Sequence, residues 1–208
     1  MQQRAIESDA QMVRQTILLL CEGGVKSVTL EAVGRRAGYS RGLVTRRYGS
    51  KDQLLIRVLD YLNAWCVQSM RNATMQEDGI AAIFISIRVA ISCIQSHPEN
   101  YRALFILWAY GLESNSIVKA ELVQLSQKSR AMHRSWLIQA QEAGDISLNA
   151  DLELILDVII SQSIGLFNQW LLDPDFRIED RLMHLMKVQL FLILKYESFY
   201  QESQYWGA

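Results

Sequence analysis

The sequence predicts an all-helical protein with two parts. Three observations point to this class: half of the 208 residues are hydrophobic, only two are proline, and long stretches have no cluster of turn-forming residues. A chain of this length buries one substantial core or two small domains that share an interface. We expect about nine helices, with a three-helix domain over residues 1–50 and a larger helical domain over residues 51–208.

The first helix is predicted over residues 4–22. Apolar residues recur there at intervals of three or four, as a helix with one buried face requires. The stripe comprises Ile6, Ala10, Val13, Ile17 and Leu20. The Gly23-Gly24 pair should end this helix, because glycine adopts the positive φ values that stop a helix without steric cost.

Residues 28–55 form the stretch around which the chain is organised, with two short helical patterns separated by a tight turn. Thr29 and Ser40 stand where each helix begins, and a hydroxyl there accepts a hydrogen bond from an unpaired backbone N–H group. Gly38 suits the end of the first helix, where the chain needs a positive φ. The buried faces are then Leu30, Val33 and Ala37 on the first helix and Leu43, Val44 and Tyr48 on the second, with Arg35 and Arg36 outside. This arrangement is typical of a helix-turn-helix unit, which lays its second helix in the DNA major groove.

The same stretch carries a strong positive charge. Seven basic residues lie between residues 24 and 51 against one acid, Glu31, a local net charge of +6 on a chain whose net charge is −1. The seven are Lys26, Arg35, Arg36, Arg41, Arg46, Arg47 and Lys51. A solvated basic face is the alternative, but a basic cluster confined to a helix-turn-helix favours contact with DNA phosphates.

Six further helices are predicted after the motif. The first continues without a linker from Lys51 to about Arg71, and would tie the DNA-binding domain rigidly to the second domain. The others span about 80–95, 99–110, 116–143, 151–172 and 178–200, separated by glycine, proline or polar residues. Asp151 should cap the helix that begins there.

Two of these helices are apolar on more than one face. Residues 151–172 are apolar around nearly the whole circumference, and residues 178–200 on more than one side. Because the chain is too short to surround both, we expect a homodimer whose interface is a four-helix bundle with two helices from each subunit. The expected interface residues are Ile160, Ile164, Gly165, Leu185 and Phe191. The alternative is a central helix inside a monomer.

The sequence shows no arrangement for catalysis or metal binding. His97, His133 and His184 stand far apart, and no metal-ligand spacing, nucleophile motif or phosphate loop occurs. Three unevenly spaced cysteines give no disulfide framework. We therefore expect no enzyme activity, no metal and no cofactor. With neither a signal peptide nor an apolar run near the ~20 residues of a membrane span, we expect a soluble, cytoplasmic protein without a membrane partner. A structural or membrane-surface helical protein would leave the basic cluster unexplained.

Residues 28–54 also resemble the N-terminal domain of the TetR (tetracycline-repressor) family of bacterial regulators. The residues in register with that family's pattern are Val28, Thr29, Leu30, Val33, Ala37, Gly38, Ser40, Gly42, Val44, Tyr48, Ser50, Lys51 and Leu54. Two positions depart from the pattern. Thr45 stands where the family usually has a phosphate-contacting tyrosine, and Gly34, where alanine is usual, should slightly weaken the first helix of the motif.

The resemblance implies a dimeric repressor that binds a palindromic DNA operator with two recognition helices and is released by a small-molecule effector. It implies that Arg41, Leu43 and Arg46 face base edges. Phosphate contacts would come mainly from Thr29, Thr45, Arg47 and Lys51, and Ser40, Gly42 and Tyr48 complete the expected DNA-binding set.

The resemblance also implies an apolar effector cavity between the helices of the second domain, where this chain has many bulky side chains. The candidate effector-binding residues are Trp65, Phe84, Arg88, Phe105, Trp108, His133, Trp136 and Phe167, with Ser86 and Gln162 as further polar candidates. Ordinary core packing is the simpler explanation for any single aromatic residue. Arg88 would either pair with an anionic effector or reach solvent, and His133 has the same ambiguity. We expect a largely apolar effector.

Overall fold

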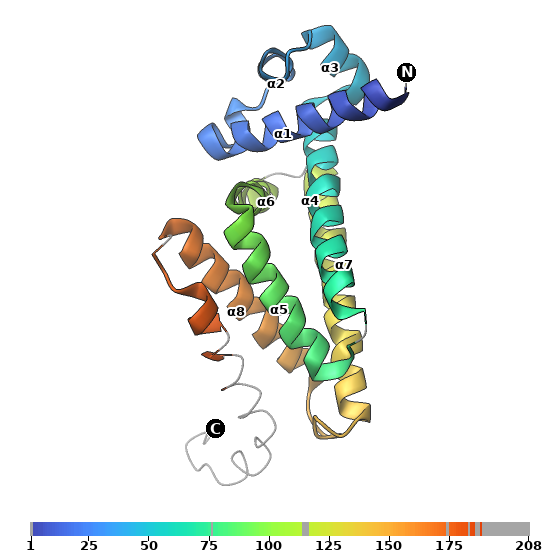
Figure 1. Cartoon of the computed structure of the whole chain (residues 1–208), viewed down its shortest axis with the longest axis vertical. Coiled ribbons are helices and arrows are strands. Elements are labelled where there is room, and N and C mark those ends of the chain that lie inside the picture. The colour runs from blue at the N-terminus through green and yellow to red at the C-terminus, as the bar shows by residue number, and fades with distance from the viewer. Residues whose placement is uncertain are drawn as a thin grey trace. The chain divides into compact units, whose positions relative to one another are not determined.

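The computed structural model describes residues 2–75, 77–113, 117–173, 175–182, 184, 185 and 188, and this part of the chain is helical with no strand. Its helices are α1 (Gln2–Ser27), α2 (Leu30–Ala37), α3 (Arg41–Tyr48), α4 (Lys51–Thr74), α5 (Gly79–Ser96), α6 (Pro98–Glu113), α7 (Ile117–Glu142) and α8 (Leu152–Leu172) (Figure 1). The predicted all-helical fold is confirmed. Residues 178–182 are also helical, where the ninth predicted helix begins, but most of residues 183–200 lie outside the described part.

The helices pack into two compact units. The first contains residues up to 68 together with residues 93–127, and the second contains residues 69–92 and the described residues from 128 onward. These units do not follow the predicted boundary after residue 50, because α6 and the start of α7 share a core with the N-terminal helices. The boundary at residue 50 therefore stays a prediction about function.

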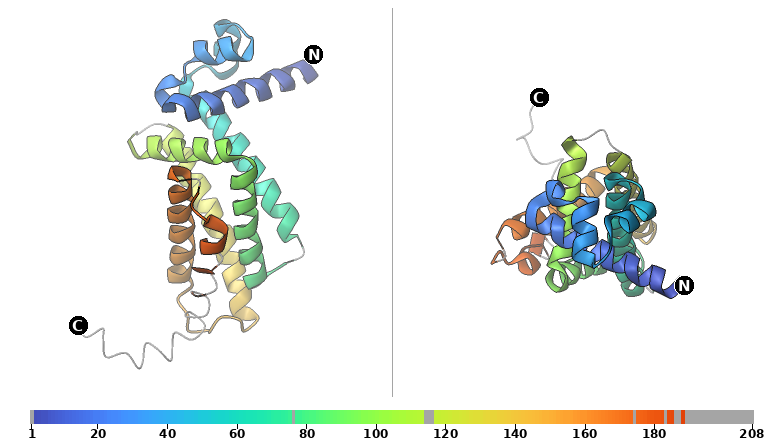
Figure 2. Two further views of the ribbon diagram at one scale, coloured as in Figure 1. Left: turned by 60° about the vertical axis from the view of Figure 1, so that its left-hand side comes forward. Right: turned by 90° about the horizontal axis from the view of Figure 1, so that it is seen from above.

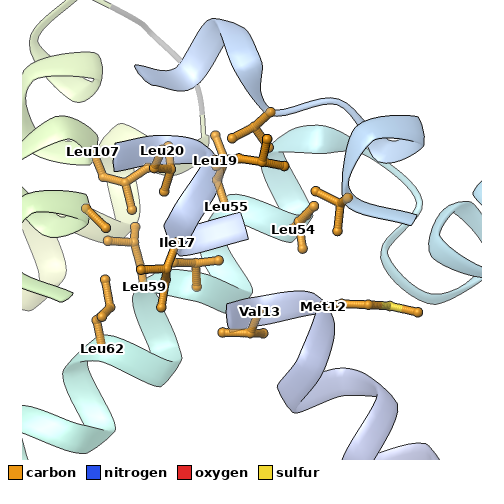
Figure 3. Packing of buried hydrophobic residues seen from close by; sticks show 14 of the residues in the cluster. Met12, Val13, Ile17, Leu19, Leu20, Leu54, Leu55, Leu59, Leu62 and Leu107 are labelled. Carbon is orange, nitrogen blue, oxygen red and sulfur yellow. The ribbon is translucent and has the colours of Figure 1, made fainter. Parts of the chain in front are cut away.

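In the first unit, α1 lies against both α2 and α6, and α2 lies against α3 (Figure 1; Figure 2). The core joins α1 and α4 to α6, and Figure 3 shows Leu20, Leu55 and Leu107 from these three helices meeting in it. All three side chains are fully buried. Burying a leucine stabilises a fold by roughly 1.5–3 kcal/mol, so this shared core anchors the N-terminal helices firmly.

The apolar stripe predicted for α1 is partly wrong. Ile6 is 58% exposed and Ala10 is also exposed. The buried residues of α1 are Ser8, Met12, Val13, Thr16, Ile17, Leu19 and Leu20. The first turns of α1 pack through polar contacts instead, since the Ala5 carbonyl and the Ser8 hydroxyl both accept hydrogen bonds from a side chain of α3.

The predicted end of the first helix at Gly23-Gly24 is confirmed. Helical backbone geometry is interrupted there, with φ −146° at Gly23 and φ +65° at Gly24, before a short helical segment runs to Ser27. The Ser27 hydroxyl lies 2.6 Å from the Leu19 carbonyl and 2.8 Å from the Gly24 carbonyl, and so satisfies carbonyl groups that the interruption leaves unpaired. The break turns the chain directly into α2.

In the second unit, ion pairs join α7 to α8. The Arg134 guanidinium makes two hydrogen bonds to the Glu153 carboxylate, and Arg130 lies 2.7 Å from the Asp157 carboxylate. Asp151 caps α8 as predicted, accepting hydrogen bonds from the Glu153 and Leu154 backbone N–H groups at 3.0 and 3.1 Å. These contacts fix the register between the two helices.

Two helices, α5 and α8, are long and apolar enough to cross a membrane by length and composition alone. The expectation that no apolar run approaches that length is therefore wrong. Half of α5 is buried within the fold, as in the core helix of a soluble protein, which passes the same test. Only 22% of the apolar window in α8 is buried, so this helix leaves much of its surface uncovered.

Candidate nucleic-acid interface

The predicted helix-turn-helix is present in detail. The Thr29 hydroxyl accepts a hydrogen bond from the Ala32 N–H at 3.0 Å, and the Ser40 hydroxyl accepts one from the Leu43 N–H at 3.2 Å. Gly38 ends α2 in the left-handed conformation, with φ 78° and ψ 25°. Each of the three capping predictions is confirmed, and together they fix where α2 stops and α3 starts.

Gly34 has a structural role that the sequence did not reveal. A Cβ atom at this position would lie 2.8 Å from the Tyr39 carbonyl oxygen and 3.2 Å from Cγ2 of Val44. The Gly34 carbonyl also accepts a hydrogen bond from the Tyr39 N–H at 2.8 Å. The missing side chain thus lets α2 approach the turn closely, which sets against the weak helix propensity of glycine.

Helix α3 presents one face to the domain and the other to solvent. Val44 is its one fully buried residue, and Leu43 and Tyr48 are half-buried. The exposed residues of α3 are Arg41, Gly42, Thr45 and Arg46. Two arginines and a threonine therefore stand on the face that a major groove would meet.

The basic residues of the motif divide into two groups. Arg36 pairs with Glu22, and the Lys51 ammonium donates to the Val25 carbonyl. Among the described residues, neither Arg41 nor Arg46 has a hydrogen-bond or ion-pair partner, although both are exposed. An unpaired exposed guanidinium is free to bind a base edge or a phosphate without first breaking an internal contact.

Arg47 and Lys51 are turned toward the domain, which bears on their predicted phosphate contacts. Arg47 donates to the Ala5 carbonyl at 2.7 Å and to the Ser8 hydroxyl at 2.8 Å. Partial burial lowers the pKa of the Lys51 ammonium. Their partners lie between 26 and 42 positions away in the sequence, so no local pattern could have indicated them.

Two functional residues were missed altogether in the sequence. The Asp9 carboxylate accepts a hydrogen bond from the Tyr48 hydroxyl at 2.7 Å. Its other oxygen accepts two from the Arg57 guanidinium, at 3.1 Å from Nε and 2.7 Å from the terminal nitrogen. Burial, followed by the hydrogen bond to Asp9, raises the pKa of the Tyr48 hydroxyl far above its usual range, so it remains a donor.

The predicted effector residues are divided between the two units. In the first unit, Trp65 packs edge-on against His97 and Tyr101, with ring centroids 5.4 and 5.9 Å apart. Phe105 is half-buried there, whereas Trp108 is 37% exposed. Trp108 is therefore the weakest of the aromatic candidates for an enclosed site.

In the second unit, Trp136 and Phe167 are buried and Phe84 is half-buried. His133 contacts the Trp136 ring edge-on and its Nδ1 lies 2.9 Å from the Ser129 carbonyl oxygen. Burial lowers the pKa of the His133 imidazole, which keeps the ring neutral near pH 7. Arg88 is exposed, in agreement with the interpretation that it reaches solvent.

The predicted dimer residues lie on or beside an uncovered face of α8. Ile164 is 49% exposed, Gly165 is exposed, and Ile160 is half-buried. Leu154 and Leu172 extend the exposed apolar face along α8, at 54% and 81% exposure. Leu185 is half-buried, and Phe191 lies outside the described residues.

A capped helix-turn-helix with free arginines on its second helix defines a DNA-binding regulator of transcription, and not an enzyme. Residues 13–58 match the sequence profile of the bacterial regulatory proteins of the tetR family. The chain belongs to the TetR family.

Relatives and solved structures agree with this assignment. The HTH-type transcriptional regulator SrpR of Pseudomonas putida is 24% identical over 197 residues, which cover 90% of this chain and 86% of SrpR. NalD, the secondary repressor of the MexAB-OprM multidrug efflux pump in Pseudomonas aeruginosa, matches with a TM-score of 0.74 and 18% identity over 92% of this chain and 98% of NalD. SmeT, solved in complex with triclosan, matches with a TM-score of 0.67 and 19% identity, covering 83% of this chain and 84% of SmeT. The two structures show a shared fold.

Proposed function

We propose that this protein is a cytoplasmic, dimeric repressor that binds a palindromic operator and is released by a small, largely apolar effector. Residues 1–50 would read the DNA, and residues 51–208 would bind the effector and the second subunit. The observation that carries the DNA-binding part is the exposed, unpartnered pair Arg41 and Arg46 on a helix whose start and end are fixed by caps.

In the proposed complex, Arg41, Leu43 and Arg46 face base edges, and the Thr29 and Thr45 hydroxyls donate to phosphates. An arginine bound to guanine through two hydrogen bonds discriminates against another base by roughly 1–3 kcal/mol. Ser40 and Gly42 stand at the start of α3, where free backbone N–H groups also suit a phosphate. The internal partners of Arg47, Tyr48 and Lys51 favour a supporting role for these three side chains.

The uncovered face of α8 supports the proposed dimer. An apolar helix face with Leu154, Ile164 and Leu172 exposed is unfavourable in water, and a second copy of the same helix would cover it. A Cβ atom at Gly165 would meet nothing within 4 Å in the single chain, so this site is open to the approach of a partner helix. Two recognition helices in such a dimer would read half-sites ~34–36 Å apart, one turn of DNA.

The second unit supports an apolar effector with at least one polar group. Phe84, Trp136 and Phe167 supply aromatic surface, while the exposed Arg88 gives no reason to require an anion. The buried side-chain oxygen of Gln162 has no hydrogen-bond partner, which costs about 1–3 kcal/mol. An effector with a hydroxyl or amine would satisfy it. NalD is named as a repressor and SmeT was solved with triclosan, which supports this mode of action by similarity.

Release would occur if the effector binds better to a state in which α4 has shifted and the two recognition helices no longer match the half-site spacing. A ligand shifts such an equilibrium only by the difference between its affinities for the two states. Native mass spectrometry of the purified protein would identify a retained effector, and tryptophan fluorescence would report its binding. A variant Trp136→Phe should change that signal while effector-free operator binding stays intact.

Binding-site selection from a random duplex library tests the DNA-binding proposal. Arg41→Ala and Arg46→Ala should each relax the preference at one base position, with a loss of roughly 1–3 kcal/mol on the best site. Arg14→Ala is the matched control, because it removes the same charge from an exposed position of α1 outside the motif. Unchanged preferences in both α3 variants would refute base reading by these residues.

A further inference from the structure

We propose that Asp9 is a positioning residue for operator recognition, which holds the C-terminal end of α3 in its DNA-reading orientation by joining it to α1 and α4. The inference rests on the proposed base reading by α3 and adds the residue that orients this helix. Asp9 itself would touch no DNA. It belongs to α1, 39 positions before its partner Tyr48.

The first step of the argument is that apolar packing alone fixes α3 weakly. The helix has eight residues, and only Val44 among them is fully buried. Helices shorter than about 12–15 residues are marginal in isolation, so contacts outside the helix must hold it. One buried valine anchors a helix at a point but leaves its rotation about the long axis free. A second anchor is needed to aim a chosen face at the groove.

The second step is that the polar contacts supply this anchor at the end of α3. Tyr48 donates to one Asp9 oxygen at 2.7 Å, and Arg47 lies 3.8 Å from the same oxygen. Arg47 also donates to the Ala5 carbonyl and the Ser8 hydroxyl, one turn apart on α1. Two consecutive residues of α3 are thereby tied to α1. Because Arg46 directly precedes them, this tie also sets the direction of Arg46.

The third step is that Asp9 extends the tie to α4. Its second oxygen receives both hydrogen bonds from Arg57, so each carboxylate oxygen serves a different helix. The Asp9 side chain is 20% exposed and Arg47 22% exposed, so these charges are partly shielded from water. Hydrogen bonds to a charged group are about twice as strong as neutral ones, and partial burial preserves them. An amide cannot replace the carboxylate, since its NH₂ group would face a donor.

Charge alone predicts the opposite outcome from positioning, which makes the inference testable. Asp9→Asn removes a negative charge from the DNA-binding domain, and that change should strengthen binding to every duplex. If Asp9 positions α3, the same variant should instead lose roughly tenfold to a hundredfold in affinity for the duplex that the wild-type protein selects. Binding to an unrelated duplex of equal length should be unchanged or tighter. The ratio of the two affinities is the readout.

Two further variants complete the experiment. Tyr48→Phe removes one hydroxyl and no charge, and should lower the same ratio by roughly threefold to tenfold. Glu22→Gln is the matched control: it makes the same change from acid to amide on α1, but its partner Arg36 lies on α2. This control should leave the ratio between the selected and the unrelated duplex unaltered.

The outcomes separate this inference from the proposed function. A lower ratio and a broadened base preference in both Asp9→Asn and Tyr48→Phe would support positioning. A ratio equal to that of the wild type in Tyr48→Phe, or a parallel loss on both duplexes that tracks the loss of thermal stability, would overturn it. If Asp9→Asn does not fold, Tyr48→Phe decides alone. Failure of base reading by α3 would appear separately, as unchanged preference in Arg41→Ala and Arg46→Ala.

Discussion

Helices α3 and α8 are both only partly covered by the rest of the chain, but their uncovered faces differ in chemistry. On α3 the exposed face carries Arg41 and Arg46, while on α8 it carries leucine and isoleucine side chains. Water solvates the first face well and the second poorly. The comparison shows that an unfilled helix face indicates its partner by its composition: a polyanion for α3, and a similar apolar helix for α8.

The largest effect is expected from a charge placed on the face of α8. Ile164→Asp would bury an unpaired carboxylate in each half of the proposed dimer interface, at a cost of at least about 3 kcal/mol, or more than a hundredfold in the dimer dissociation constant. Sedimentation velocity at micromolar concentration measures it. Ser135→Asp, at an exposed site on α7, is the control and should remain dimeric. A monomeric wild-type protein would remove the dimer and with it the palindromic operator.

The next effect concerns the one apolar anchor of α3. Val44→Ala deletes two buried methyl groups and should lower the free energy of unfolding by about 2 kcal/mol. Denaturant unfolding followed by circular dichroism measures the change. Val123→Ala, at a position of α7 that is 48% exposed, should change it by less than about 0.5 kcal/mol. Equal losses in the two variants would contradict the view that one valine anchors α3.

The capping residues sharpen the comparison, because both helices have one. Ser40→Ala and Asp151→Ala should each lower the free energy of unfolding by about 1 kcal/mol. Only Ser40→Ala should also weaken operator binding, since it loosens the start of the recognition helix. Thermal unfolding and fluorescence anisotropy on labelled operator measure the two effects. Loss of operator affinity in Asp151→Ala equal to that in Ser40→Ala would show that the helices are not independent in this respect.

The smallest effect is a pH dependence that belongs to the second unit. The pKa of His133 is lowered by burial from its ordinary value of 6.5, so the unfolded chain binds a proton at a higher pH than the folded one. Stability should therefore fall as the pH decreases through 6.5, and fall no further below the folded pKa. The melting temperature of His133→Gln should differ less between pH 7.5 and pH 5.5 than that of the wild type. His97→Gln, at an exposed histidine, should retain the wild-type difference.

The helix-turn-helix could be predicted residue by residue because its determinants are local. Thr29, Gly38 and Ser40 each act within three or four positions of the chain, so the sequence reports them directly. The failure at Ile6 and Ala10 has the opposite cause. Helical periodicity shows which side of a helix is apolar, but it does not show how far a partner helix extends along that side.

The internal partners of the recognition helix could not be predicted for the same reason. Tyr48 meets Asp9 across 39 positions, and Arg57 meets it across 48. No spacing rule connects such residues, and a basic residue that binds inside the domain has the same sequence signature as one that binds DNA. The sequence therefore identified the DNA-binding surface but not which of its cations are free. Arg47 and Lys51 are the residues where this matters most.

The close approach at Gly34 has a consequence for protein engineering. With the Tyr39 carbonyl 2.8 Å and the Val44 side chain 3.2 Å from where a Cβ atom would stand, these three positions form one steric unit. Contacting residues do not contribute additively, so an exchange at one of them changes what the other two tolerate. A regulator retargeted by transplanting a recognition helix from a relative should therefore receive residues 34–44 as one block. Exchanging the exposed arginines alone leaves that block intact and is the safer route to a new operator preference.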